Sequence, residues 1–224
     1  MTIELLNIDC MDYMATLPDK SFDLAIVDPP YGIGVDGQEW NNTSTGKKSI
    51  KGLTKGLKVV KKSWDNTIPD EKYFENLFRV SVNQIVFGAN YMTDYLPAKK
   101  GWICWDKQQP EGVHFSKFEL AWSSFDRPAE IFRMGNHVGF LAKGADCKIH
   151  PTQKPIKLYQ WLLNNYAKPG QRILDTHLGS GSSAIAAHYF GVDFVGCELD
   201  ADYYHAALKR FELATAQTTL FDIA

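Results

Sequence analysis

The sequence predicts an α/β domain built on a largely parallel β-sheet. Short apolar runs alternate with stretches of helical periodicity along the chain, and this alternation is typical of parallel strands joined through helices. The chain has 224 residues, of which 45% are hydrophobic and 13% aromatic. That content is enough to bury the core of a single domain spanning residues 1–224.

The individual elements follow from the spacing of apolar residues and from the turn residues between them. Strands are expected at 3–7, 22–27, 84–88, 101–105, 117–123, 129–134, 172–176 and 193–197. Helices are expected at 10–17, 70–82, 90–96, 155–167, 181–190 and 201–216. The connection at 32–69 is the exception, because a compact domain seldom holds so long a structureless loop unless the loop is functional or disordered.

Charge is distributed unevenly along this connection. The net charge of the chain is −2 at pH 7, yet the stretch between Trp40 and Trp64 has no acidic residue and contains Lys47, Lys48, Lys51, Lys55, Lys58, Lys61 and Lys62. Two interpretations stay open. The 32–69 connection is either a mobile basic loop that orders against a phosphate backbone, or a solvated loop with no partner.

The N-terminus and the cysteines exclude several classes of protein. No basic region followed by an apolar stretch occurs after Met1, and the apolar runs elsewhere are short, so we expect no signal peptide, no membrane span and a cytoplasmic protein. Cys10, Cys104, Cys147 and Cys197 lie far apart without metal-ligand spacing. Reduced thiols and no bound metal are therefore expected.

The Asp-Pro-Pro-Tyr motif (residues 28–31) follows the strand expected at 22–27, at the carboxyl end where open α/β sheets place ligands. The residue types of this motif suit the activation of an aromatic amino group, which is a poor nucleophile because its lone pair is delocalised. The Asp28 carboxylate and the Pro29 carbonyl can accept its two N–H bonds, Pro30 stiffens the chain, and Tyr31 offers a ring for stacking on a flipped base. The alternative is a turn with no function.

A second candidate site lies at 174–198. A strand ending at Asp175 is followed by a glycine turn (residues 179–184) that opens a helix, and the next strand ends at Glu198. Glycines allow close backbone approach, the helix start offers N–H groups to an anion, and Glu198 is placed to accept hydrogen bonds from ribose hydroxyls. The same pattern also fits a dinucleotide site, or a tight turn without a ligand.

Together these motifs resemble the amino-methylating DNA methyltransferases of the circularly permuted beta group, and small phage-type members in particular. The Asp-Pro-Pro-Tyr motif looks like the family's catalytic tetrapeptide, residues 174–183 like its cofactor loop, and residues 150–155 (His-Pro-Thr-Gln-Lys-Pro) like the segment that completes the methionine pocket. Thr152 can cap the helix after that segment, and Pro155 suits its first turn. Residues 87–91 and 102–107 resemble the strand ends that wall the base pocket.

The resemblance implies a Rossmann-like, S-adenosylmethionine-dependent methyltransferase fold, with a mostly parallel seven- to eight-stranded sheet and helices on both faces. It implies direct methyl transfer to an exocyclic amino group of double-stranded DNA, with adenine N6 preferred, and a short target-recognition region at 108–149. The catalytic residues would be Asp28, Pro29, Pro30 and Tyr31. The cofactor-binding residues would be Asp9, Cys10, Asp28, His150, Thr152, Lys154, Asp175, His177, Gly179, Ser180, Gly181, Ser182, Glu198 and Leu199.

Alternatives stay open beside this interpretation. Cytosine N4, an RNA amino group or a glutamine amide pose the same chemical problem, and a nicotinamide-dependent oxidoreductase or a non-catalytic DNA-binding protein are interpretations from other classes. The C-terminal tail, Gln217 to Phe221 with its Leu220-Phe221 pair, resembles peptides that dock on the replication sliding clamp. The alternative is that this pair packs on the sheet. A homodimer is left open.

Overall fold

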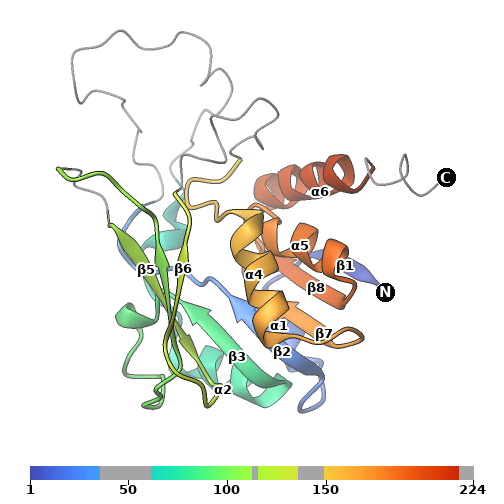
Figure 1. Cartoon of the computed structure of the whole chain (residues 1–224). Helices are drawn as coiled ribbons and strands as arrows, with labels where there is room; N and C mark the ends of the chain where they lie inside the picture. Colours follow the sequence, from blue (N-terminus) through green and yellow to red (C-terminus); the bar gives the residue numbers. More distant parts are fainter. Residues whose placement is uncertain (36–61, 113–115, 136–148, 217–224) are drawn as a thin grey trace, which may run out of the picture.

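The computed structural model of the protein describes residues 1–35, 62–112, 116–135 and 149–216. In these residues the chain forms one eight-stranded sheet, with helices packed against both faces (Figure 1). The strand order is β1-β8-β7-β2-β3-β5-β4-β6. The predicted fold class is confirmed.

Most neighbouring strands are parallel. β5 is the exception, because it runs antiparallel to both β3 and β4. The strands are β1 (Ile3–Asn7), β2 (Phe22–Val27), β3 (Ser81–Phe87), β4 (Trp102–Asp106), β5 (Phe118–Ser123), β6 (Glu130–Arg133), β7 (Arg172–Asp175) and β8 (Asp193–Glu198). Each predicted strand is present, with shifts of up to three residues at its ends.

The helices divide between the two faces of the sheet. One apolar cluster contains residues of α4, α5 and α6, and the other contains residues of α1 and α2. The helices are α1 (Cys10–Ala15), α2 (Glu71–Val80), α4 (Ile156–Tyr166), α5 (Ser182–Phe190) and α6 (Ala201–Ala216), and two 3-10 turns are η1 (Ser63–Asp65) and η2 (Ala89–Tyr91).

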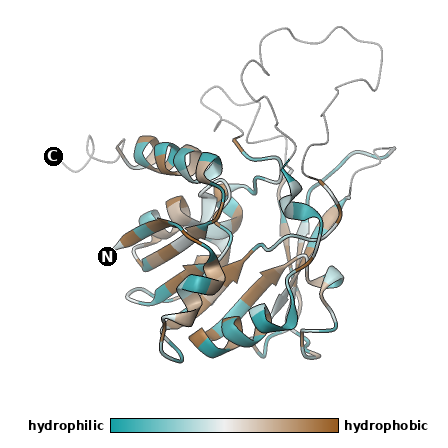
Figure 2. Cartoon of the chain, turned by 180° about the vertical axis from the view of Figure 1, so that it is seen from behind, coloured by the Kyte–Doolittle hydropathy of each residue, from teal (hydrophilic) through white to brown (hydrophobic). Residues whose placement is uncertain are grey.

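The sheet is buried on both faces because its central strands are apolar at successive positions. In β2, Leu24 and Ile26 point into the cluster under α4, whereas Ala25 and Val27 point into the cluster under α2. Figure 2 shows these central strands in brown, with teal concentrated on helices and loops. A strand that is apolar throughout is the pattern expected for a parallel sheet covered on both sides.

One predicted helix is absent from the structure, and two others end two residues early, the helix expected at 10–17 at Ala15 and the helix expected at 70–82 at Val80. The helix expected at 90–96 is wrong, since the chain forms only the short η2 turn after Gly88, which has a φ of +66°. Met92 and Leu96 are buried, and their spacing mimics a helical face although the intervening Thr, Asp and Tyr favour it weakly. The helix expected at 70–82 ends at Val80, because Ser81 already begins β3.

Three predicted segments lie partly or wholly outside the described residues. Of the basic loop at 32–69, residues 36–61 are not described, and of the recognition region at 108–149, residues 113–115 and 136–148 are not. Cys147 and the tail at 217–224 also fall outside. Among the helices that are described, none has the length and apolar content required to cross a bilayer.

Candidate functional site

The site lies where the connections of the sheet change direction. β2 and β7 are parallel neighbours that pair Leu24 with Ile173. From β2 the chain proceeds through α2 to β3 on one side, and from β7 it proceeds through α5 to β8 on the other. Such a reversal leaves a crevice at the carboxyl ends of the two strands, where open α/β sheets bind ligands.

One cavity joins the two predicted half-sites. It has a volume of about 710 Å³, and its wall contains Asp28 after β2 as well as residues 176–180 after β7. Of the predicted site residues, those lining it are Asp9, Cys10, Asp28, Pro30, His150, Thr152, Lys154, His177, Gly179, Ser180, Glu198 and Leu199. Pro29, Tyr31, Asp175, Gly181 and Ser182 do not line it, although each lies within two residues of one that does.

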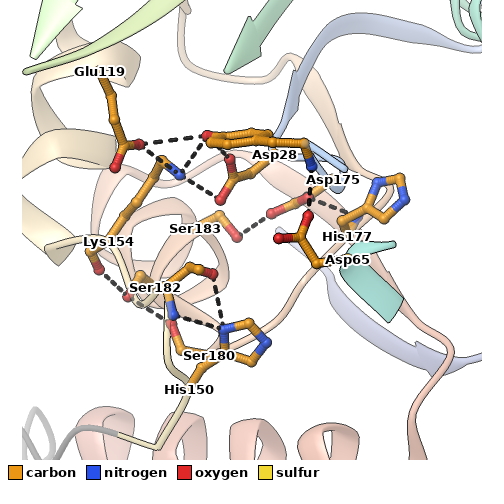
Figure 3. A network of polar contacts seen from close by, with 12 residues as sticks. Asp28, Asp65, Glu119, His150, Lys154, Asp175, His177, Ser180, Ser182 and Ser183 are labelled. Carbon is orange, nitrogen blue, oxygen red and sulfur yellow. Dashed lines mark hydrogen bonds and ion pairs between the residues drawn. The ribbon is translucent and has the colours of Figure 1, made fainter. Parts of the chain in front are cut away.

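Asp28, which lines this cavity, is held by two neighbours (Figure 3). Its Oδ1 accepts a hydrogen bond from the Tyr31 hydroxyl at 2.6 Å, and its Oδ2 forms an ion pair with the Lys154 ammonium. The same ammonium lies 3.1 Å from Oε2 of Glu119. Lys154, predicted to bind cofactor, thus also neutralises the predicted catalytic carboxylate.

Burial sets the electrostatics of this network. Desolvation raises the pKa of Asp28 above its usual range, and the Lys154 ammonium only partly opposes this effect. For Glu119, burial also works upward, but Lys154 and Lys107 outweigh it and lower the pKa. Burial likewise opposes the charge of Lys154, yet Asp28 and Glu119 hold its pKa above the usual value. Glu119 is therefore the more firmly ionised of the two acids.

Tyr31 is fixed on three sides. Its ring stacks on that of Tyr91, with centroids 5.4 Å apart and an interplanar angle of 18°, and it packs directly over the backbone of Gly88. Its backbone N–H donates to Oδ1 of the buried Asp65 at 2.8 Å. Asp65 also accepts hydrogen bonds from the N–H groups of Gly32 and Val35, so one carboxylate anchors the chain that leaves the motif.

The glycine turn is built by side chains that bind its backbone. Glu198 accepts the N–H of Gly179 at 2.8 Å with one oxygen and the N–H of Asp200 at 2.9 Å with the other. Gly181 precedes α5 with a φ of +73°, and a Cβ there would touch Ala207. Glu198 lines the cavity, but each of its oxygens already accepts one amide N–H. The ribose role predicted for Glu198 therefore stays a prediction.

Two residues just before the glycine turn have shifted pKa values. Asp175 accepts from the hydroxyl of Ser183 at 2.6 Å and from the N–H of His177 at 3.0 Å. Burial raises the pKa of Asp175 to about 7 and lowers the pKa of His177 to about 4. At neutral pH the His177 ring is uncharged.

The segment before α4 differs in detail from the prediction. The residue at the N-cap of α4 is Pro155, and it makes no side-chain capping bond, so the expected capping by Thr152 is wrong. The Thr152 hydroxyl instead lies 3.1 Å from Nδ1 of His150. Ser182 reaches this segment and donates to the Lys154 carbonyl at 2.7 Å, which ties the segment to the start of α5.

The cavity also has a wall that sequence reasoning missed. Lys62, counted among the basic-loop lysines, lies 2.6 Å from Asp200 and 2.8 Å from Asp202 at the start of α6. Beside it, Trp64 packs on His150, whose ring contacts Tyr203. No motif marks Lys62, Trp64 or Tyr203. Glu119 was missed too, since nothing in its local sequence connects it to Asp28.

The described cysteines and acids do not form a metal site. Cys10, Cys104 and Cys197 are free thiols, and burial raises the pKa of Cys10 to about 12. Within residues 1–35, 62–112, 116–135 and 149–216, no group of three or more His, Cys, Asp or Glu side chains is placed to hold a metal ion.

Known proteins share this fold. The chain has the Rossmann-like fold of the S-adenosylmethionine-dependent methyltransferases. A family model for DNA methylases of the N6/N4 type matches residues 105–209. YubD of Escherichia coli (strain K12), a candidate methylase, is 27% identical over 225 residues, which cover 95% of this chain and 90% of that protein.

Two solved structures support the fold. The M1.HpyAVI–SAM complex superposes with a TM-score of 0.59 at 17% identity, covering 93% of this chain and 98% of the other. PvuII DNA methyltransferase, named as cytosine-N4-specific, superposes with a TM-score of 0.61 at 13% identity, covering 96% and 91%.

Proposed function

We propose that this protein is a DNA methyltransferase that transfers a methyl group from S-adenosylmethionine to an exocyclic amino group of a flipped base, with adenine N6 as the preferred target. One observation carries the proposal. The carboxylate of Asp28 and the glycine turn line the same cavity at the crevice between β2 and β7. The DNA methylase family match and the likeness to YubD agree with this function.

The cavity suits the cofactor in size and in chemistry. Its volume of about 710 Å³ falls within the usual range for small-molecule sites. The Glu198 oxygens each accept one amide N–H and retain a lone pair for a hydroxyl group. Trp64 and Tyr203 offer aromatic surface, and the glycine turn brings backbone close to a ligand. S-adenosylmethionine supplies an electrophilic methyl group on a sulfonium.

The residues of the Asp-Pro-Pro-Tyr motif bind and activate the amine. In our proposal, Asp28 and the Pro29 carbonyl accept the two N–H bonds, which directs the nitrogen lone pair toward the methyl group. A nitrogen–carbon bond forms as the carbon–sulfur bond breaks, and the nitrogen must then release one proton. Asp28, whose pKa is raised by burial, is the neighbouring base that can accept it.

Cytosine N4 is the second candidate. PvuII DNA methyltransferase, which shares the fold, is named as cytosine-N4-specific, and the amino group of cytosine needs the same two acceptors. Incubation of the protein with tritiated S-adenosylmethionine and unmethylated duplex DNA, followed by nucleoside chromatography, distinguishes the two products. A parallel incubation with RNA tests whether an RNA amino group is the target instead.

Replacing Asp28 tests the proposal directly. Asp28→Ala is expected to abolish methyl transfer, a loss of at least about 100-fold for removal of a preorganised acceptor, because the substitution deletes the carboxylate that receives the amine. The thermal shift caused by S-adenosylhomocysteine should persist. Asp126→Ala is the control, because Asp126 is an exposed carboxylate that pairs with the exposed Lys100. Near-normal transfer by Asp28→Ala would reject the assignment.

A further inference from the structure

The Lys154 ammonium lies between two carboxylates, and only one of them belongs to the predicted site. It forms an ion pair with Asp28 and lies 3.1 Å from Glu119, and its side chain is 2% exposed. Glu119 extends from β5, and its other oxygen lies 2.5 Å from the Lys107 ammonium. Two acids and two ammonium groups therefore neutralise one another in a partly buried row.

In this arrangement an arriving amine competes with the partners that the Asp28 carboxylate already has. Its Oδ2 is bound by Lys154 and its Oδ1 by the Tyr31 hydroxyl. A substrate amine that donates to Oδ2 competes with the ammonium for this oxygen and weakens their ion pair. A buried ammonium left without a counter-charge is strongly disfavoured, so Lys154 needs a second carboxylate close by.

We infer that Glu119 is a positioning residue, which takes over the Lys154 ammonium when a substrate amine displaces it from Asp28. The inference rests on the proposed methyl transfer. Among the described residues, Asp28 and Glu119 are the only carboxylates within ion-pair distance of Lys154. Glu119 stays in place because Lys107 holds it from the other side, so the exchange moves the ammonium rather than the acid.

Glu119 has the properties that this exchange requires. The two lysines keep its pKa below the usual range in spite of burial, so it is charged when the ammonium arrives. It lies 3.4 Å from the Tyr31 hydroxyl, next to the group that holds the other oxygen of Asp28. Glu119 lies outside the wall of the cavity, so its effect on transfer is indirect, and a test in a background without the Lys154 ammonium separates the route through Lys154 from the route through Tyr31.

The test compares four proteins: wild type, Glu119→Gln, Lys154→Gln and the double variant. Glutamine keeps the shape of glutamate and removes its charge. The readout is the single-turnover rate of tritium transfer to unmethylated genomic duplex DNA at saturating S-adenosylmethionine, with thermal unfolding as the measure of folding. In the wild-type background, Glu119→Gln should slow transfer by about 10- to 100-fold, the loss typical of one charge-assisted hydrogen bond.

In the Lys154→Gln background, the same substitution should not slow transfer, because no ammonium then needs a partner. A wild-type rate for Glu119→Gln, or equal slowing in both backgrounds, would overturn the inference. If Lys154→Gln gives no measurable rate, rescue of Glu119→Ala by added formate but not by formamide supports the inference, and equal or absent rescue rejects it. A wild-type protein that methylates no DNA would reject the proposed function itself.

Discussion

Replacing Gly88 with alanine places a methyl group inside the space of the Tyr31 ring. A Cβ atom at Gly88 would lie 2.1 Å from Cε1 and 2.3 Å from Cδ1 of that ring. The ring must move as a whole, because it is rigid and its hydroxyl is bound to Asp28. At a φ of +66° alanine adds strain of about 1–2 kcal/mol, and overpacking adds about 1–3 kcal/mol.

We therefore expect Gly88→Ala to lower the free energy of unfolding by about 2–5 kcal/mol in urea titrations. It should also slow methyl transfer, since a displaced Tyr31 shifts the Asp28 carboxylate to which its hydroxyl is bound. Gly170→Ala is the matched control. Gly170 has a φ of +81°, and a Cβ atom there would meet no atom of the described residues within 4 Å, so this substitution carries the backbone strain alone. Equal destabilisation by the two substitutions, or an unchanged transfer rate in Gly88→Ala, would refute this reasoning.

Two further predictions concern acids of the site. Asp65→Asn should lower the free energy of unfolding by about 1.5–3 kcal/mol and slow transfer. Asp65 uses two oxygens to accept the N–H groups of Tyr31, Gly32 and Val35, whereas an amide has one acceptor oxygen. An unchanged urea midpoint would contradict this prediction. The second prediction is a pH dependence. Between pH about 4 and 6.5, folding makes Asp175 gain a proton and His177 lose one, because burial raises the first pKa to about 7 and lowers the second to about 4. Stability falls with rising pH through Asp175 and rises through His177, so the two effects cancel. In Asp175→Asn only the second remains, and urea titrations at several pH values should show stability rising with pH by up to about 1.4 kcal/mol per unit relative to wild type; parallel curves would disprove it.

The sequence predicts the elements of this fold well where a single physical signal dominates. β2 and α6 have the predicted bounds, because the first is apolar at nearly every position and the second keeps its helical periodicity for four turns. The helix predicted at 90–96 failed because burial of Met92 and Leu96 produces helical spacing without a helix. Spacing reports which side chains are buried, and burial alone does not decide the backbone conformation.

The two half-sites could be predicted because each is a short motif that follows a strand. The ion pairs between them could not. Asp28, Glu119 and Lys154 come from three segments far apart in the chain, and their meeting depends on β5 running antiparallel to β3. The same limit applies to Lys62. Its place in a lysine-rich stretch suggested phosphate contacts, whereas in the structure it forms ion pairs with Asp200 and Asp202.

The pairing of β2 with β7 has a consequence for how the protein acquires its shape. Leu24 pairs with Ile173, so the middle of the sheet joins residues from opposite halves of the chain, and contacts of such long range slow folding. During synthesis, β2 has no neighbour on that edge until residues 172–175 have emerged. An apolar strand edge that waits unpaired is prone to aggregation, and shortened forms of the chain that lack β7 should be insoluble as well as inactive.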